Sequence, residues 1–164
     1  MVCQLVRLKL AYPHWGPEKI RDLYFLAQEN GVARNVNVIQ YNLDQGLALF
    51  DDASFDVVLQ LDTLQHLRNT AHMLQETARV GRLGIVSFPN FAHWPNRLHV
   101  AAGRMPVTRA LPYEWYDTPN IRVGTYADFE VLARKRGLNI LDSFGMHKGL
   151  PVRRWPNLTA SVAV

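Results

Sequence analysis

The sequence predicts a three-layer α/β fold, because patterns of short buried strands alternate along the chain with amphipathic helix patterns. The segments FDVVLQL at 55–61 and LGIVSF at 83–88 are almost continuously apolar, which is typical of parallel strands buried on both faces. Right-handed crossovers between such strands would build a mostly parallel sheet. The two last strand patterns, at 138–144 and 158–164, are expected to form an antiparallel C-terminal edge.

The first part of the chain predicts a strand, a helix and a second strand. Apolar and basic residues alternate in MVCQLVRLKLAY at 1–12, so this segment could supply a strand to the sheet. Over 17–34, apolar residues recur at spacings of three and four after a proline in the first turn, which indicates a helix. The β-branched VNVIQ at 36–40 is a short strand, and a turn follows at 42–46.

Two further helices follow from capping residues and apolar spacing. Thr63 is expected to cap a helix over 64–80, whose apolar residues fall on one face. Pro89 ends the strand 83–88, since proline donates no hydrogen bond to a sheet. Thr125 opens another helix, which Gly137 stops.

Length and composition are those of an ordinary soluble domain. The chain has 164 residues, 48% of them hydrophobic and 20% charged, which suits a single domain over 1–164. It has no run of about 20 apolar residues, the length that a membrane span requires. Arg7 and Lys9 interrupt the apolar start, which makes it a poor signal peptide. We therefore expect a cytoplasmic protein without a membrane partner.

Several classes of site are disfavoured by what the sequence lacks. The net charge is +4, but the basic residues are scattered, which favours a solvated surface over a nucleic-acid interface. Cys3 is the single cysteine, so neither an intramolecular disulfide nor a thiolate-rich metal site can form. The six histidines include no pair four residues apart, and we expect no metal site. G-x-S-x-G and P-loop motifs are also missing.

The most informative stretch of the chain leaves the end of a predicted strand and is dense in proline, aromatic residues and arginine. This aromatic segment (89–122) is expected to act as a lid. Its aromatic and arginine side chains are of the types that dominate binding hot spots. The candidate partner-binding residues are Phe91, Trp94, Arg97, Tyr113, Trp115 and Tyr116.

Two alternatives to partner binding stay open for the aromatic segment. Tyr113 and Trp115 could pack onto the sheet, with Glu114 and Asp117 holding turns. The same carboxylates and phenols could instead perform acid–base chemistry. The sequence does not indicate which of them would be the catalytic residue.

Five blocks of the sequence together resemble the MetW family of methionine-biosynthesis proteins, relatives of class I S-adenosylmethionine-dependent methyltransferases. They are VNVIQ at 36–40, NLDQGL at 42–47, FDVVL at 55–59, RVGRLGIVSFPNFAHW at 79–94 and GRMPVTRALPYEWYDTPNI at 103–121. The resemblance covers residues 32–145, after a divergent N-terminus over 1–31. It implies a Rossmann-like class I methyltransferase fold that is truncated at its N-terminus.

The resemblance also implies where S-adenosylmethionine would lie. Asn42 would accept a hydrogen bond from the adenine amino group, and Leu43 would make an apolar contact beside it. Gln60 and Leu61 would line the methionine part of the cofactor. The family's glycine-rich turn of the type D-x-G-x-G-x-G is absent, together with about a third of the fold. We therefore expect weak or no binding of the cofactor.

The function that the resemblance implies is that of an accessory protein of methionine biosynthesis, which binds homoserine O-acyltransferase through the aromatic segment and activates it. One alternative is an active S-adenosylmethionine-dependent methyltransferase. Another is a non-functional remnant with a truncated or misassigned start. A sheet that lacks its first family strands would also have an unpaired edge, which could join two copies into a homodimer.

Overall fold

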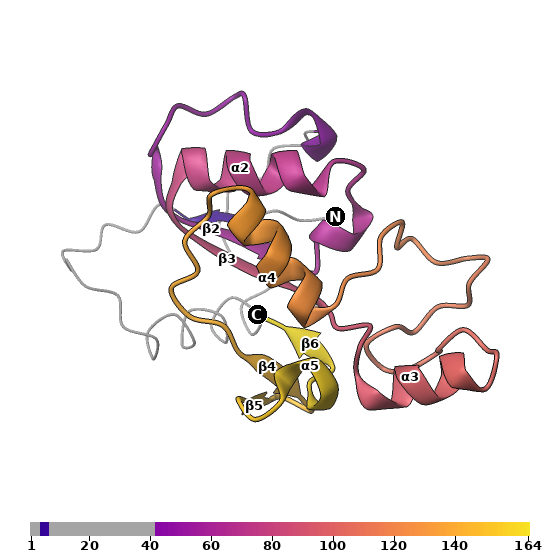
Figure 1. Cartoon of the computed structure of the whole chain (residues 1–164). Helices are drawn as coiled ribbons and strands as arrows, with labels where there is room; N and C mark the ends of the chain where they lie inside the picture. Colours follow the sequence, from indigo (N-terminus) through magenta and orange to yellow (C-terminus); the bar gives the residue numbers. More distant parts are fainter. Residues whose placement is uncertain (1–3, 7–41) are drawn as a thin grey trace.

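The computed structural model describes residues 4–6 and 42–164, and the strands of this part form one six-stranded sheet (Figure 1). The strands are β1 (Gln4–Val6), β2 (Phe55–Leu61), β3 (Gly81–Pro89), β4 (Gly145–His147), β5 (Leu150–Val152) and β6 (Val162–Ala163). Their order across the sheet is β1-β2-β3-β6-β4-β5. Strands β2 and β3 are parallel, and the other neighbouring pairs are antiparallel.

Helices and short 3-10 turns connect these strands. They are η1 (Leu43–Gln45), η2 (Leu64–His66), α2 (Thr70–Val80), α3 (Trp94–Ala101), α4 (Tyr126–Lys135) and α5 (Pro156–Thr159). Helix α2 forms the crossover between the parallel strands β2 and β3, as the two apolar strand patterns predict. The predicted α/β class and the antiparallel C-terminal edge are confirmed, and the sheet is mixed, with β2 and β3 as the parallel pair among the described strands.

The core lies on both faces of β2, because successive side chains of a strand point to opposite sides. Val58 belongs to a buried cluster that includes Met73 and Leu74 of α2, and partly buried residues of α4 pack against the same cluster. Figure 1 shows α2 and α4 lying across the sheet. Val57 and Leu59 belong to a second buried cluster. The apolar run of β2 therefore contributes side chains to the core on both faces of the sheet.

A strand at the N-terminus is also found where the alternating pattern predicts one. The backbone of β1 pairs antiparallel with β2, with Leu5 opposite Val58. The predicted helix over 17–34 and the strand over 36–40 lie outside the described residues. The predicted turn at 42–46 is within the described residues and contains η1, which begins at an Asn42 cap.

The predicted start of the helix over 64–80 is wrong. The Thr63 hydroxyl donates a hydrogen bond to the backbone oxygen of Leu61 at 3.1 Å and caps no helix. The chain instead forms η2, and α2 begins at Thr70, where the Asn69 side chain accepts a hydrogen bond from the backbone N–H of His72 at 3.2 Å. Thr125 does cap α4, as predicted, through a hydrogen bond from the backbone N–H of Asp128 at 3.1 Å.

Both predicted C-terminal strands are shifted. Residues 138–144 are irregular and lead into β4. In this stretch the side chains of Asp142 and Ser143 contact Arg153 and Tyr126. Within 158–164, strand structure is limited to β6, because the helix α5 that begins at Pro156 extends into this segment.

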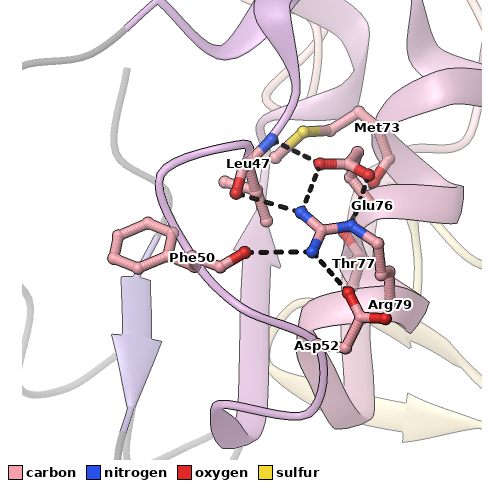
Figure 2. Close-up of polar contacts among 7 residues, drawn as sticks. All are labelled: Leu47, Phe50, Asp52, Met73, Glu76, Thr77 and Arg79. Carbon is pink, nitrogen blue, oxygen red and sulfur yellow. Dashed lines mark hydrogen bonds and ion pairs between the residues drawn. The ribbon is translucent and has the colours of Figure 1, made fainter.

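Arg79 joins α2 to the loop between η1 and β2 (Figure 2). Its guanidinium donates hydrogen bonds to the backbone oxygens of Leu47 at 3.1 Å and Phe50 at 2.9 Å. It also binds the carboxylates of Glu76 and Asp52, each at 2.7 Å. Two loop carbonyls and two carboxylates thus share one cation, which fixes the loop that leads into β2.

Candidate functional site

The carboxyl ends of β2 and β3 meet at one edge of the sheet, because the two strands are parallel. Leu61 is opposite Ser87 in the register. The backbone N–H of Asp62 donates to the backbone oxygen of Ser87 at 3.1 Å and lies 3.2 Å from its hydroxyl. Ligands and partners of open α/β sheets bind at such an edge. The aromatic segment (89–122) begins here.

Asn90 anchors the start of the aromatic segment. It is fully buried, and its Oδ1 accepts hydrogen bonds from the backbone N–H groups of Ala92 and Tyr126, each at 3.2 Å. Its Nδ2 lies 2.9 Å from the backbone oxygen of Ala160 and 3.1 Å from that of Asn157. One side-chain amide therefore connects the end of β3 to the start of α4 and to α5.

The end of the aromatic segment is anchored at η2. The backbone N–H groups of Ile121 and Arg122 both donate to the backbone oxygen of Gln65, at 2.9 and 3.0 Å. A ring nitrogen of His66 lies 3.1 Å from the backbone oxygen of Pro119. Because both ends are hydrogen-bonded to the edge of the sheet, the segment between them is held as a loop with fixed ends.

The middle of the aromatic segment is exposed. Figure 1 shows α3 and the loop after it standing to one side of the sheet. Of the fifteen exposed large hydrophobic side chains in the described part, nine belong to this segment: Trp94, Leu98, Val100, Met105, Val107, Tyr113, Trp115, Tyr116 and Ile121. Contiguous exposed apolar patches mark interaction sites, and the number of exposed apolar side chains makes this segment a candidate for one.

Trp115 and Tyr116 are the most exposed aromatic residues of the segment. Their exposed fractions are 70% and 71%, and their ring centroids lie 5.7 Å apart in an edge-to-face arrangement. Trp94 and Tyr113 are about half exposed, at 51% and 47%. Trp115 therefore does not pack onto the sheet, which was the alternative that the sequence left open. The structure brings these two neighbouring aromatic rings to the surface together.

The other two candidate partner-binding residues lie at the base of the segment. The Arg97 Nε donates a hydrogen bond to the backbone oxygen of Ala92 at 2.6 Å. Its guanidinium therefore connects α3 to the residues just before it. Phe91 is half-buried and lines a cavity beside β3. Its backbone N–H donates to the oxygen of Gly124 at 2.9 Å.

Comparison with protein families agrees with the sequence blocks that run from β2 through this segment. The family model described as "Methionine biosynthesis protein MetW" matches residues 26–164. The chain belongs to the MetW family. The matched range contains every described element after β1, including the whole aromatic segment. Membership gives the MetW-family chain a role in methionine biosynthesis.

Similarity to a curated relative also supports membership in the MetW family. The chain is 38% identical over 148 residues to the bifunctional methionine biosynthesis protein MetXA/MetW of Rhodopirellula baltica (strain DSM 10527 / NCIMB 13988 / SH1). The alignment covers 85% of this MetW-family chain and 24% of that relative. The chain thus spans about a quarter of the length of the curated relative it matches.

The side chains expected to bind S-adenosylmethionine make several contacts within the described part of the MetW-family chain. The Asn42 side chain is exposed and accepts a hydrogen bond from the backbone N–H of Asp44 at 3.1 Å. Gln60 is fully buried, and its side-chain amide donates to the Thr77 hydroxyl of α2. Leu43 and Leu61 pack in opposite core clusters. The fold itself uses these side chains, and cofactor binding by them stays a prediction.

Two features of this edge were not anticipated from the sequence. His93 and His147, which come from α3's N-terminus and from β4, have ring centroids 5.1 Å apart. Burial, and then the nearby His147, lower the pKa of His93. Asp62 has a φ of 48°, which is uncommon for a residue other than glycine. The sequence gives no signal for a positive φ at this position, because the residue that follows the strand is not a glycine.

No helix in residues 42–164 is long and apolar enough to cross a membrane. Likewise, no three histidine, aspartate or glutamate side chains converge within the part of the chain that the structure describes. The exposed aromatic segment is the feature on which we build a functional proposal.

Proposed function

We propose that this chain is an accessory protein of methionine biosynthesis that binds homoserine O-acyltransferase through the exposed side of the aromatic segment (89–122). The observation that carries the proposal is the exposure of Trp115 and Tyr116 on a loop whose two ends are fixed. Exposing two large aromatic rings to water is unfavourable, and burying them against a partner recovers that free energy.

The composition of the segment supports a protein partner. It contains four arginines, Arg97, Arg104, Arg109 and Arg122, and two acidic residues, Glu114 and Asp117. Tryptophan, tyrosine and arginine are the residue types that contribute most to protein interfaces. The fixed ends of the loop reduce the conformational entropy that is lost on binding.

The curated relative supports the choice of partner. Its printed name joins MetXA and MetW in one bifunctional protein. Two domains fused in one chain are held at a high effective concentration relative to each other. A fusion is therefore consistent with two domains that bind one another. In the proposal, the MetW-family chain activates the acyltransferase only as far as it binds the active conformation more tightly than the inactive one.

The test is a calorimetric titration of the acyltransferase from the same organism with the full chain. We expect a complex with micromolar or tighter Kd, and Trp115→Ala or Tyr116→Ala should each weaken it at least about tenfold, the effect of losing a hot-spot residue. Trp155→Ala is the matched control, because Trp155 is 67% exposed but lies outside the segment. Equal binding by all three variants, or no complex at micromolar concentrations, would contradict the proposal.

The proposal assigns a binding role and no methyl transfer. It is supported by the side chains of Asn42 and Gln60, which the fold already uses. We expect titration with S-adenosylhomocysteine to give no saturable heat in the micromolar range. Low-micromolar binding would restore the methyltransferase alternative, and failure of both titrations would favour a non-functional remnant.

A further inference from the structure

A cavity of about 370 Å³ lies beside the aromatic segment, on the side of the sheet that α2 and α4 cover. Its walls come from the start of α2, the end of β3, α4 and the end of the aromatic segment. Most of the wall is apolar, and its large side chains include Phe88, Phe91, Leu111, Phe129 and Leu132. A volume of this size is within the range of small-molecule sites.

The charged groups of this wall are mainly cationic. Arg68 and Arg122 both line the cavity and are exposed to solvent. The Arg122 guanidinium donates to the backbone oxygen of Arg68 at 2.9 Å, which holds the two residues together. Within residues 42–164, the Arg68 guanidinium is in none of the hydrogen bonds or ion pairs found. It is thus available to an anion.

The start of α2 adds to the positive character of the same wall. Thr70 and Ala71, the first two residues of this 11-residue helix, line the cavity. The first N–H groups of a helix have no partner within it, and the helix dipole favours negative charge near them. Anion affinity therefore has two sources here, the arginines and the helix end.

Gln65 provides a polar group of a different kind in the cavity wall. Its side chain is only 8% exposed, and its Oε1 accepts no hydrogen bond from the described residues. A buried amide oxygen without a donor costs free energy, so Gln65 marks a polar position in a wall that is otherwise mostly apolar. Asp128 is the single acidic residue among the described residues of the wall. It accepts a hydrogen bond from the Thr125 hydroxyl at 2.7 Å and so serves the cap of α4.

We propose that this cavity binds a small amphipathic carboxylate, with its apolar body against the phenylalanines and its carboxylate at Arg68, Arg122 and the start of α2. The site is distinct from the exposed rings that the proposed function uses, and it does not depend on that function. The apolar wall selects the body of the ligand, and the cations select its charge.

The test is a titration of the full chain with 4-phenylbutyrate, compared with 4-phenylbutanol and 4-phenylbutylamine, which have the same apolar body. We expect saturable binding of the carboxylate with a Kd of about 1 mM or tighter, and at least about tenfold weaker binding of the alcohol and the amine. Arg68→Gln should weaken binding of the carboxylate at least about fivefold, because it removes the cation without disturbing a contact of the fold.

A second variant and a control locate the site. Ala71→Leu keeps a good helix former and fills the cavity, so it should abolish binding while the circular dichroism spectrum stays unchanged. Arg104→Gln makes the same change of charge on an exposed residue outside the cavity wall and should leave binding unchanged. No saturation by 4-phenylbutyrate, equal binding of the amine, or undiminished binding by Ala71→Leu would each overturn the proposal.

Discussion

The Glu76 carboxylate accepts a hydrogen bond from the backbone N–H of Leu47 at 2.8 Å, although the two residues are 29 positions apart. The same carboxylate binds the Arg79 guanidinium through both of its oxygens, at 2.7 and 2.8 Å. Figure 2 shows these contacts converging between α2 and the loop before β2. Glu76 therefore supplies an acceptor for a backbone N–H group of the loop, and Arg79 supplies donors for two of its backbone carbonyls.

Glu76→Gln should destabilise the fold at neutral pH by about 2 kcal/mol, the scale of hydrogen bonds to a charged group. The Arg79 hydrogen bonds, together with that from Leu47, lower the pKa of Glu76 from 4.5 to about 2. A lowered native pKa means that the unfolded chain takes up a proton first, so this stabilisation is lost as the pH falls from 4.5 towards 2. Urea unfolding at several pH values should show wild type and variant converging over that window.

Glu114→Gln is the control for this prediction, because Glu114 is an exposed carboxylate in the aromatic segment. It should change the free energy of unfolding by less than about 0.5 kcal/mol at every pH. A constant difference between wild type and Glu76→Gln down to pH 2 would show that the carboxylate charge is not what stabilises the loop.

Asn90→Asp should be more damaging than its small change in shape suggests. The substitution replaces an amide that faces the backbone oxygens of Asn157 and Ala160 with a carboxylate that would repel them. We expect a loss of about 3 kcal/mol or more, because buried acceptors lose their donor and a charge is buried beside them. Thermal unfolding measures it, and the exposed Asn139→Asp should leave the Tm nearly unchanged.

Much of the sheet could be predicted because its signals are local. The apolar runs of β2 and β3 and the Thr125 cap of α4 depend on residues a few positions apart, and all three are found. The start of α2 was misjudged for the same reason. Thr63 and Asn69 are both good capping residues, and the choice between them depends on where the Thr63 hydroxyl finds an acceptor.

The candidate site could be predicted only in part. Composition alone identifies the aromatic segment, since its proline and aromatic content stands out, and Trp115 and Tyr116 are indeed exposed. The anchoring of that segment could not be predicted, because Asn90 contacts residues 66 to 70 positions away. No spacing rule connects such distant residues. The cavity is likewise built from separate segments whose meeting depends on the whole fold.

Gly145→Ala should disrupt the contact between β4 and the end of α5. A Cβ at Gly145 would collide with the Cβ of Ala160, which is fully buried. Overpacking of this kind costs about 1–3 kcal/mol. The double variant Gly145→Ala/Ala160→Gly should recover much of the loss, because it moves the methyl group from one backbone to the other. A double variant no more stable than Gly145→Ala would place the cost elsewhere.

The pair His93 and His147 should make stability depend on pH just below neutrality. Burial first, and then His147, lower the pKa of His93 from 6.5, and its Nε2 has no hydrogen-bond partner among the described residues. Below pH 6.5 the unfolded chain therefore binds a proton that the native chain resists, so stability falls as the pH drops from 6.5 towards the lowered native pKa. His93→Phe should reduce this slope in urea unfolding and leave stability at pH 8 equal or higher, since no side-chain cap is lost. The exposed His99→Phe on the same helix should keep the wild-type slope, and an unchanged slope in His93→Phe would refute the assignment.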